Sequence, residues 1–187
     1  MRRARRNGNL LKGVAAGLVG GIVASWTMNQ FQAMWTRNQE GFDKPHGAQS
    51  MQPSAGEDEA DQSNRYQEQQ DDATVKVAKA ISENVFGHEL KEHEERPAGA
   101  AVHYAFGIAT GGVYGALAEV APTVSKGAGI PFGAAYWVLA DETVTPLLGL
   151  SKGPSEYRLK THFYALSSHL VYGLTAELTR RAVRAAL

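Results

Sequence analysis

The chain contains no cysteine and carries no net charge, because 19 lysines and arginines balance 19 aspartates and glutamates among its 187 residues. Without thiols it can form neither a disulfide framework nor a thiolate metal site. Short enzyme motifs are missing as well: the sequence has no G-x-S-x-G turn, no H-E-x-x-H or H-x-x-x-H pair, and no phosphate-binding loop with its lysine. The sequence therefore indicates the protein's setting better than its activity.

Neutrality on average hides a strong separation of charge along the chain. Basic residues gather at the two ends, whereas the stretch from Gln39 to Arg96 is acid-rich, with "GEDEAD" at its centre. A globular protein in water would mix the two signs more evenly. The basic residues at the ends are Arg2, Arg3, Arg5, Arg6, Arg180, Arg181 and Arg184.

Four segments are poor in charge and rich in Ala, Gly, Val and Leu, at about 13–35, 98–120, 127–150 and 161–179. Each is about as long as the ~20 residues that a helix needs to cross a bilayer. None is as apolar as a lone anchor, which is typical of helices that bury polar faces in a bundle. The first lacks an obvious signal-peptide cleavage site, so we prefer an uncleaved helix. We predict an all-α fold, a four-helix transmembrane bundle that makes residues 1–187 a single membrane domain.

Orientation follows from the positive charges, which are retained on the cytoplasmic side. Basic residues at both ends predict that both termini are cytoplasmic and that the extramembrane segment 36–97 lies outside. The loop "SKGPSEYRLK" would also lie outside, and its Lys152, Arg158 and Lys160 disagree with the rule.

The outer segment divides into two parts. Up to about Gln70 it has few large apolar residues, and we expect it to be mostly disordered. From Asp72, a plausible N-cap, apolar residues recur at helical spacing as far as Gly87, a plausible helix end. We expect one amphipathic helix there, either on the outer membrane face or packed on the domain. The recurring apolar residues are Val75, Ala78, Ile81 and Val85.

Small residues recur every four positions in all four segments, and a four-residue step stays nearly on one face of a helix. In lipid, such stripes let helix backbones approach closely, so each stripe is expected to face another helix. The stripes are Gly13, Gly17, Gly21, Ser25 and Asn29; Gly99, His103, Gly107, Gly111, Gly115 and Glu119; Gly129, Gly133, Trp137, Asp141, Thr145 and Gly149; and Ala165, His169, Gly173 and Glu177.

Two of these segments end in the same motif, V-Y-G-x-x-A-E, in "GGVYGALAEV" and "SHLVYGLTAEL". Its glycine should face a neighbouring helix, and its acid, Glu119 or Glu177, should lie at the cytoplasmic end. There the acid can meet water or a basic group such as Arg180 or Arg181, at far lower cost than at mid-membrane. The repeated motif suggests a duplicated two-helix unit.

Ionisable and polar residues within the spans are the candidates for chemistry. Asp141 and His169 should lie near the bilayer midplane, and we expect them to pair. Three interpretations stay open: a hydrogen bond that fixes helix register, a proton-linked or pH-sensing role, and a divalent metal site. The full candidate set is Asp141, Glu142, His169, His103 and Asn29.

Several stretches resemble a known family: "GLVGGIVASWTMNQFQ", "DDATVKVAKAISENVFGHEL", "AVHYAFGIATGGVYGALAEVAP" and "SSHLVYGLTAELTRR". They are similar to the YagU-type family of small bacterial inner-membrane proteins, a domain of unknown function. The resemblance implies a four-helix protein of the bacterial inner membrane and a link to acid tolerance. It carries over no catalytic residues.

We therefore expect an integral membrane protein that is non-enzymatic and stress- or acid-tolerance-linked. A small transporter or proton-conducting module built on the Asp/His residues is the alternative, followed by an intramembrane metal-dependent hydrolase. The expected partners are the lipid bilayer and, as an open option, further copies of the chain, but no nucleic acid. No cofactor is expected, and whether a metal binds is left open.

Overall fold

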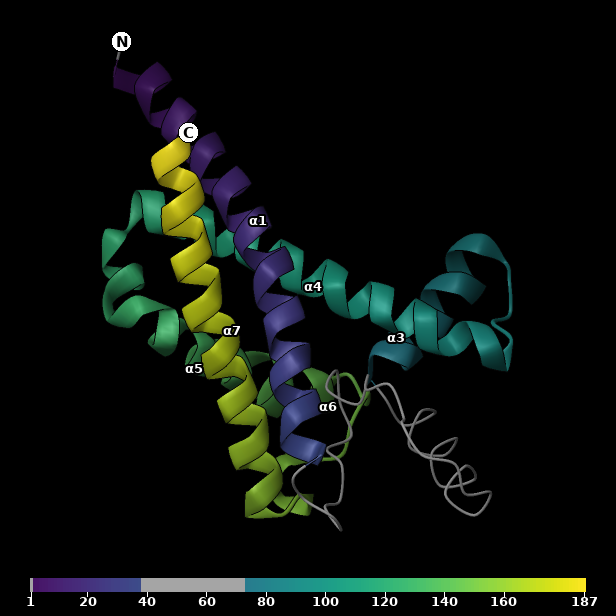
Figure 1. The fold of residues 1–187 in the computed structure, drawn as a ribbon. Helices are drawn as coiled ribbons and strands as arrows, with labels where there is room; N and C mark the ends of the chain where they lie inside the picture. Colours follow the sequence, from purple (N-terminus) through teal and green to yellow (C-terminus); the bar gives the residue numbers. More distant parts are fainter. Residues whose placement is uncertain (1, 38–72) are drawn as a thin grey trace. The chain divides into compact units, whose positions relative to one another are not determined.

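The computed structural model describes residues 2–37 and 73–187, with side chains from Asn9 to Trp35 and from Ala73 onward. Within these residues every regular element is helical and none is a strand, which confirms the predicted all-α class (Figure 1). The segment expected to be disordered up to about Gln70, and the expected cap Asp72, lie outside the described residues. The chain divides into two compact units, which are described in turn.

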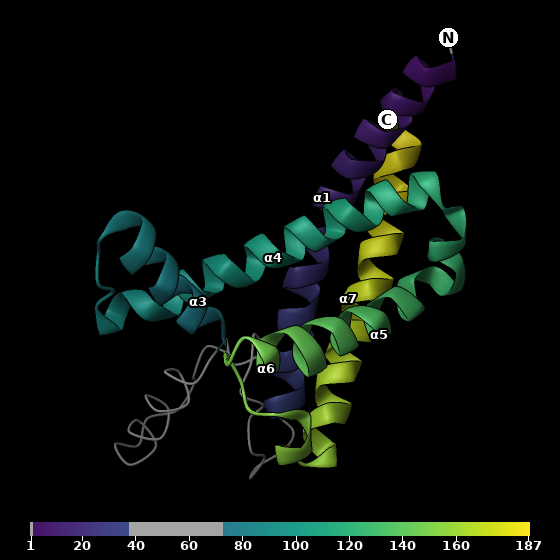
Figure 2. The same ribbon diagram turned by 180° about the vertical axis from the view of Figure 1, so that it is seen from behind.

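The first unit combines residues up to Phe31 with Tyr104–Trp137 and Leu166–Leu187. Within it, α1 and α7 lie side by side and α4 crosses α1 (Figures 1 and 2). The buried residues of its apolar cluster are two alanines, one methionine and one tyrosine. The helices that contribute to this unit are α1 (Arg2–Arg37), α4 (Glu92–Val120), α5 (Ile130–Leu139) and α7 (Leu159–Ala186).

The connection from α4 to α5 runs through η2 (Pro122–Gly129). Gly127, Ala128 and Gly129 have φ values of 72°, 54° and 82°, a left-handed run that glycine adopts without steric cost. A Cβ on Gly129 would also lie 2.8 Å from the Cβ of Glu177. Helix α5 therefore begins at Ile130, three residues after the start of the predicted third span.

The third predicted span is not one regular helix. A π-helical turn, η3 (Ala140–Val144), follows α5, and α6 (Thr145–Leu147) ends the helical run. Two threonine hydroxyls donate hydrogen bonds to backbone carbonyls five residues earlier in the chain. Thr143 donates to the Val138 carbonyl at 2.8 Å, and Thr145 donates to the Ala140 carbonyl at 2.5 Å. Because a π turn is wider than an α turn, the predicted four-residue stripe keeps its spacing only as far as α5.

The second unit combines Gln32–His103 with Val138–Ala165. Besides η3 and α6 it contains α3 (Ala73–Ile81), η1 (Ser82–Phe86) and η4 (Pro154–Glu156). Helix α3 packs on the unit, which was one of the two predicted placements of the amphipathic helix. Lys79 pairs with Glu95 at 2.7 Å, and Lys76 donates to the Leu150 carbonyl at 3.1 Å.

The predicted apolar stripe of this helix is only half correct. Val75 and Ala78 are buried, but Ile81 is 43% exposed and Val85 is 70% exposed. The α-helix ends at Ile81, and the π turn that follows changes the angle between successive residues, so the α-helical spacing no longer applies. Gly87 does end the helical run, with φ 63°, as predicted.

Candidate functional site

Glycines bring α1 and α4 into backbone contact. A Cβ on Gly17 would lie 2.9 Å from the Gly115 Cα, and one on Gly111 would lie 2.7 Å from the Gly21 Cα. Neither position has room for any side chain, because real Cβ atoms do not approach so closely. The two stripes run antiparallel, since residue numbers rise along α1 as they fall along α4. The predicted contact between these small-residue stripes is confirmed.

The second pair, α5 and α7, makes the same kind of contact. A Cβ on Gly173 would lie 2.9 Å from the Gly133 Cα, and one on Gly133 would lie 3.3 Å from the Gly173 Cα. Helix α1 also touches α7, where a Cβ on Gly20 would lie 2.7 Å from the Ala176 carbonyl oxygen. Thus the glycine of each V-Y-G-x-x-A-E motif faces the helix that precedes it in the first unit, as the sequence predicts.

The tyrosines of the two motifs are both buried but differ in their partners. Tyr172 donates a 2.5 Å hydrogen bond to the Gly107 carbonyl on α4. Tyr114 packs against Phe132 of α5, with ring centroids 4.2 Å apart and ring planes tilted by 33°. These tyrosines therefore connect one glycine-packed helix pair to the other.

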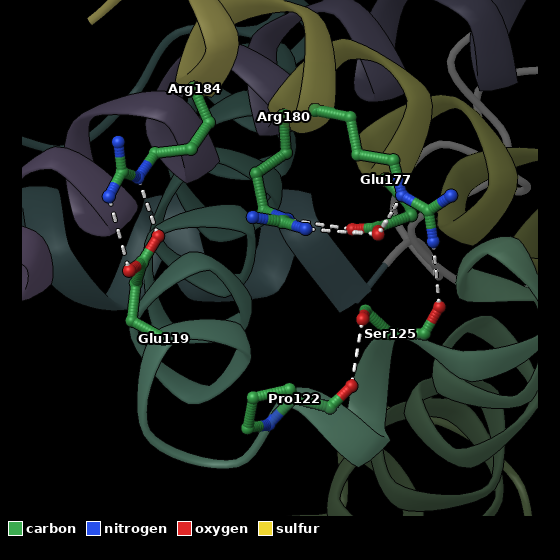
Figure 3. A network of polar contacts seen from close by, with 7 residues as sticks. Glu119, Pro122, Ser125, Glu177, Arg180 and Arg184 are labelled. Atoms are coloured by element: carbon green, nitrogen blue, oxygen red, sulfur yellow. Dashed lines mark hydrogen bonds and ion pairs between the residues drawn. The ribbon is translucent and has the colours of Figure 1, made fainter.

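The acid of the second motif is completely buried and paired. Glu177 is 0% exposed and accepts two hydrogen bonds from Arg180, at 2.7 and 3.0 Å, and one from Arg181 at 2.5 Å. Arg181 also donates to the Ser125 carbonyl at 3.1 Å, which attaches α7 to η2 (Figure 3). Of the two surroundings predicted for the motif acids, water or a basic group, Glu177 has the second.

Glu119, the acid of the first motif, has a different partner. Arg184 of α7 donates to its two carboxylate oxygens at 2.6 and 3.4 Å (Figure 3). The same guanidinium reaches the Asn9 side chain of α1 at 3.5 Å, and Lys12 donates to the Leu187 carbonyl. The group formed by Glu119, Glu177, Arg180, Arg181 and Arg184 is called the arginine cluster below.

Two arginines of the arginine cluster are held more firmly in the protonated form by their acids. The hydrogen bond to Glu177 raises the pKa of Arg180, and the hydrogen bond to Glu119 raises the pKa of Arg184. Arginine is already protonated at every physiological pH. The cluster is therefore a permanent ionic connection among the helices of the first unit.

Two of the candidates within the spans lie in the first unit. His169 is 4% exposed, and its ring meets Tyr136 edge-on at 5.3 Å. The Asn29 amide donates to the Tyr104 hydroxyl at 3.3 Å. His169 is therefore buried beside an aromatic ring, whereas Asn29 is only partly buried.

The remaining candidates lie in the second unit. His103 is 7% exposed, and Asp141 is partly buried in the π turn η3. The expected pairing of Asp141 with His169 joins residues of different units and stays a prediction. Glu142 has a partner that the sequence reasoning missed, His162, whose Nδ1 lies 2.7 Å from its carboxylate.

A metal centre finds no support in the part of the chain that the structure describes. Residues 9–35 and 73–187 contain no group of three His, Asp or Glu side chains placed to hold a metal ion. The interpretation of Asp141, His169 and His103 as ligands therefore has no geometric counterpart among these residues.

Comparison with known proteins gives one match. A family of proteins of unknown function, DUF1440, matches residues 53–178. No curated protein and no solved structure matches the chain. The family match takes in most of α4, η2, α5 and α7, including both V-Y-G-x-x-A-E motifs, and covers more than half of the sequence. The chain therefore belongs to the DUF1440 family of proteins of unknown function.

Proposed function

We propose that the protein is a small multi-pass membrane protein of the bacterial inner membrane with a non-enzymatic role. The observation that carries this proposal is where large apolar side chains lie. On the helices many of them are exposed, whereas the interior takes mostly glycine, alanine, tyrosine and polar groups. The exposed set includes Leu11 at 72%, Ile22 at 47%, Trp26 at 56%, Phe106 at 56% and Val113 at 59%; the buried set includes Ser25, Ser168, His169, Glu177 and Arg180.

This distribution is the reverse of what water selects. In soluble proteins Glu and Arg are almost never fully buried unless they are paired, and contiguous apolar surface is small. In lipid, apolar side chains face the hydrocarbon, and small and polar residues make the contacts between helices. The glycine contacts of α1 with α4 and of α5 with α7 fit that arrangement.

Helix length supports more than one crossing. The segment Asn9–Trp35 of α1 is long and apolar enough to span a bilayer by length and composition, and α1 is the one helix among the described residues of which this holds. Helices α4 and α7 have 29 and 28 residues, enough in length for the ~20 that a crossing needs. Their glycines and buried polar residues lower the hydropathy while serving helix packing. We propose four crossings, in α1, α4, the run from α5 to α6, and α7.

The arginine cluster supports the proposed orientation. It joins the N-terminal half of α1, the end of α4 and the end of α7 through Asn9, Glu119 and Arg184. Basic residues are retained in the cytoplasm, so this end of the unit is placed there with both termini. Residues 36–97 then lie outside.

The proposed role is that of a stress- or acid-tolerance-linked component of the membrane, which could act as an oligomer. This part rests on the resemblance to YagU-type proteins. The glycine contacts and permanent ion pairs favour a rigid structural unit over a moving one.

A transporter or proton-conducting module is the second candidate. It is favoured by the buried polar interior of the first unit, where Ser168 is 0% and His169 4% exposed next to Tyr136. Histidine titrates near neutral pH and can pass protons.

Topology is tested with reporter fusions after Gln70 and after Leu187, using one reporter active only outside and one active only inside. We expect opposite sides for the two positions. A result that places both on the same side would overturn the proposed orientation, and soluble, membrane-free protein would overturn the membrane proposal.

The two candidate roles are separated by proton flux into vesicles that contain the purified protein. A non-enzymatic structural role predicts no flux above that of empty vesicles. Flux that is lost in His169→Gln but kept in the exposed control His88→Gln would establish the proton-conducting alternative.

A further inference from the structure

Both ring nitrogens of His162 are engaged. Its Nδ1 lies 2.7 Å from a carboxylate oxygen of Glu142, and its Nε2 lies 3.0 Å from the Pro154 carbonyl oxygen. The side chains of His162 and Glu142 are 22% and 19% exposed, so their contact is partly buried, whereas the contact with Pro154 is exposed. It joins three parts of the second unit: the π turn η3, the loop between α6 and α7, and the first turns of α7.

The two partners constrain the protons on this contact. A carbonyl oxygen only accepts hydrogen bonds, and so does an ionised carboxylate. If Glu142 is ionised, His162 must carry a proton on both nitrogens to donate to both. If His162 is neutral, with its proton on Nε2, Glu142 must be protonated to donate to Nδ1. Both arrangements hold the same number of protons, one more than a neutral histidine beside an ionised glutamate.

We propose that His162, Glu142 and the Pro154 carbonyl form a proton-linked clasp, which attaches η4, in the loop between α6 and α7, when it takes up one proton and releases η4 when the proton leaves. This inference does not depend on the proposed membrane function. It adds a pH-dependent conformational device to the fold.

The release should occur at the loop. When the extra proton is lost, neutral His162 can keep one of its two hydrogen bonds. The bond to the charged Glu142 is the stronger one, because hydrogen bonds to ionised groups are roughly twice as strong as neutral ones. The contact with the Pro154 carbonyl is then lost.

The loop has its own internal contacts that persist after release. The Gly153 amide donates to the Glu156 carboxylate at 2.9 Å, and the Lys152 amide donates to the Tyr157 hydroxyl at 3.2 Å. The Tyr157 ring also meets the His162 ring edge-on at 6.3 Å. The loop should therefore move as a folded piece.

Other charged groups are close to the clasp in the sequence and influence its proton uptake. Asp141 precedes Glu142 in η3 and favours uptake. Glu156 in the loop has the same sign, while Arg158, just before α7, and Lys160, in its first turn, oppose uptake. This balance of charges sets the pH at which half of the molecules are released. It does not change the stoichiometry of one proton.

The sign of the pH dependence follows from that stoichiometry. The closed state binds the extra proton, so it is favoured at low pH. Above the titration of the pair, the closing equilibrium constant falls about tenfold for each pH unit.

The absence of native cysteine makes the test direct. Ser155, an exposed residue of η4, is replaced by cysteine and spin-labelled in the full-length protein in detergent. Its line shape is recorded between about pH 5 and pH 9, a range that brackets the pKa of about 6.5 of a histidine in a model peptide. We expect an immobilised component at low pH that converts to a mobile one with a slope of one proton.

Glu142→Gln is the decisive variant. A glutamine amide can donate to the unprotonated Nδ1 while Nε2–H still donates to Pro154, so the clasp closes without an extra proton. We expect the label to stay immobilised across the range, with no pH dependence. The control Glu156→Gln removes a loop carboxylate outside the clasp and should keep the one-proton transition.

A line shape that does not change with pH in the parent would overturn the proposal. So would a Glu142→Gln variant that keeps the parent transition. Fold integrity is checked by helical circular dichroism, and ¹⁵N shifts of the His162 ring provide a second readout. In the parent these shifts should follow the label transition, and titration of the ring without loop release would also overturn the proposal.

Discussion

The two V-Y-G-x-x-A-E motifs have nearly the same sequence but occupy different environments. In both, the glycine touches a neighbouring backbone: Gly115 on α1 and Gly173 on α5. Their acids differ. Glu177 is fully buried and pairs with two arginines of its own helix, whereas Glu119, whose side chain is 15% exposed, is paired across helices with Arg184. The motif thus specifies the packing contact, and the surroundings decide what the acid does.

The largest expected effect is a difference in stability between substitutions of the glycines at helix contacts and a substitution on the exposed face. Gly111→Leu and Gly173→Leu should each destabilise the protein by more than the ~1–3 kcal/mol of ordinary overpacking, because the new side chain meets backbone atoms. Val113→Leu, at a 59% exposed position, is the matched control and should be nearly neutral. Thermal unfolding in detergent measures all three, and leucine variants that melt like the parent would contradict the glycine contacts.

The next effect distinguishes the two acids. Glu177→Ala leaves Arg180, only 8% exposed, without its partner, and should cost about 3–5 kcal/mol. Glu119→Ala should cost clearly less, because the side chain of Arg184 is 27% exposed and can be hydrated. Equal losses of unfolding free energy for the two variants would show that burial does not set the difference.

A smaller effect is expected for the tyrosine of the second motif. Tyr172→Phe removes the hydrogen bond to the Gly107 carbonyl while keeping the ring, and should cost about 1 kcal/mol. The loss should appear as a lower melting temperature with unchanged helical content. No change in stability would indicate that the carbonyl is equally well satisfied without this donor.

Salt gives the smallest and most discriminating effect. Raising the ionic strength from about 0.1 to 1 M shortens the Debye length from about 10 to 3 Å, which screens exposed pairs more than buried ones. The destabilisation caused by Glu119→Ala should therefore shrink with salt, while that caused by Glu177→Ala should persist. The same salt dependence for both variants would contradict the contrast in burial.

Local spacing explains which parts of the site could be predicted. Glycine stripes depend only on helical geometry, so the contacts through Gly17, Gly111 and Gly173 follow from a four-residue step. The pairing of Glu177 with Arg180 and Arg181 joins positions three and four apart on one helix, which always lie close together.

The missed contacts join residues distant in the chain. Arg184 and Glu119 are 65 residues apart, and His162 and Glu142 are 20 apart. No periodicity within a helix indicates such a partner, because it depends on which helices cross and at what height. The π turns were missed for a related reason, since a change in hydrogen-bond register leaves little trace in an apolar sequence.

By itself, the sequence determined the all-α class, the small-residue faces on which helices meet, and the charge of the two ends, because all three depend on local spacing and composition. The tertiary structure alone decided which of two equivalent acids is buried, where the helices depart from α geometry, and that both nitrogens of His162 are bonded. These features arise from the packing of one helix against another, which supplies both the desolvation of a charged group and the partner that compensates for it.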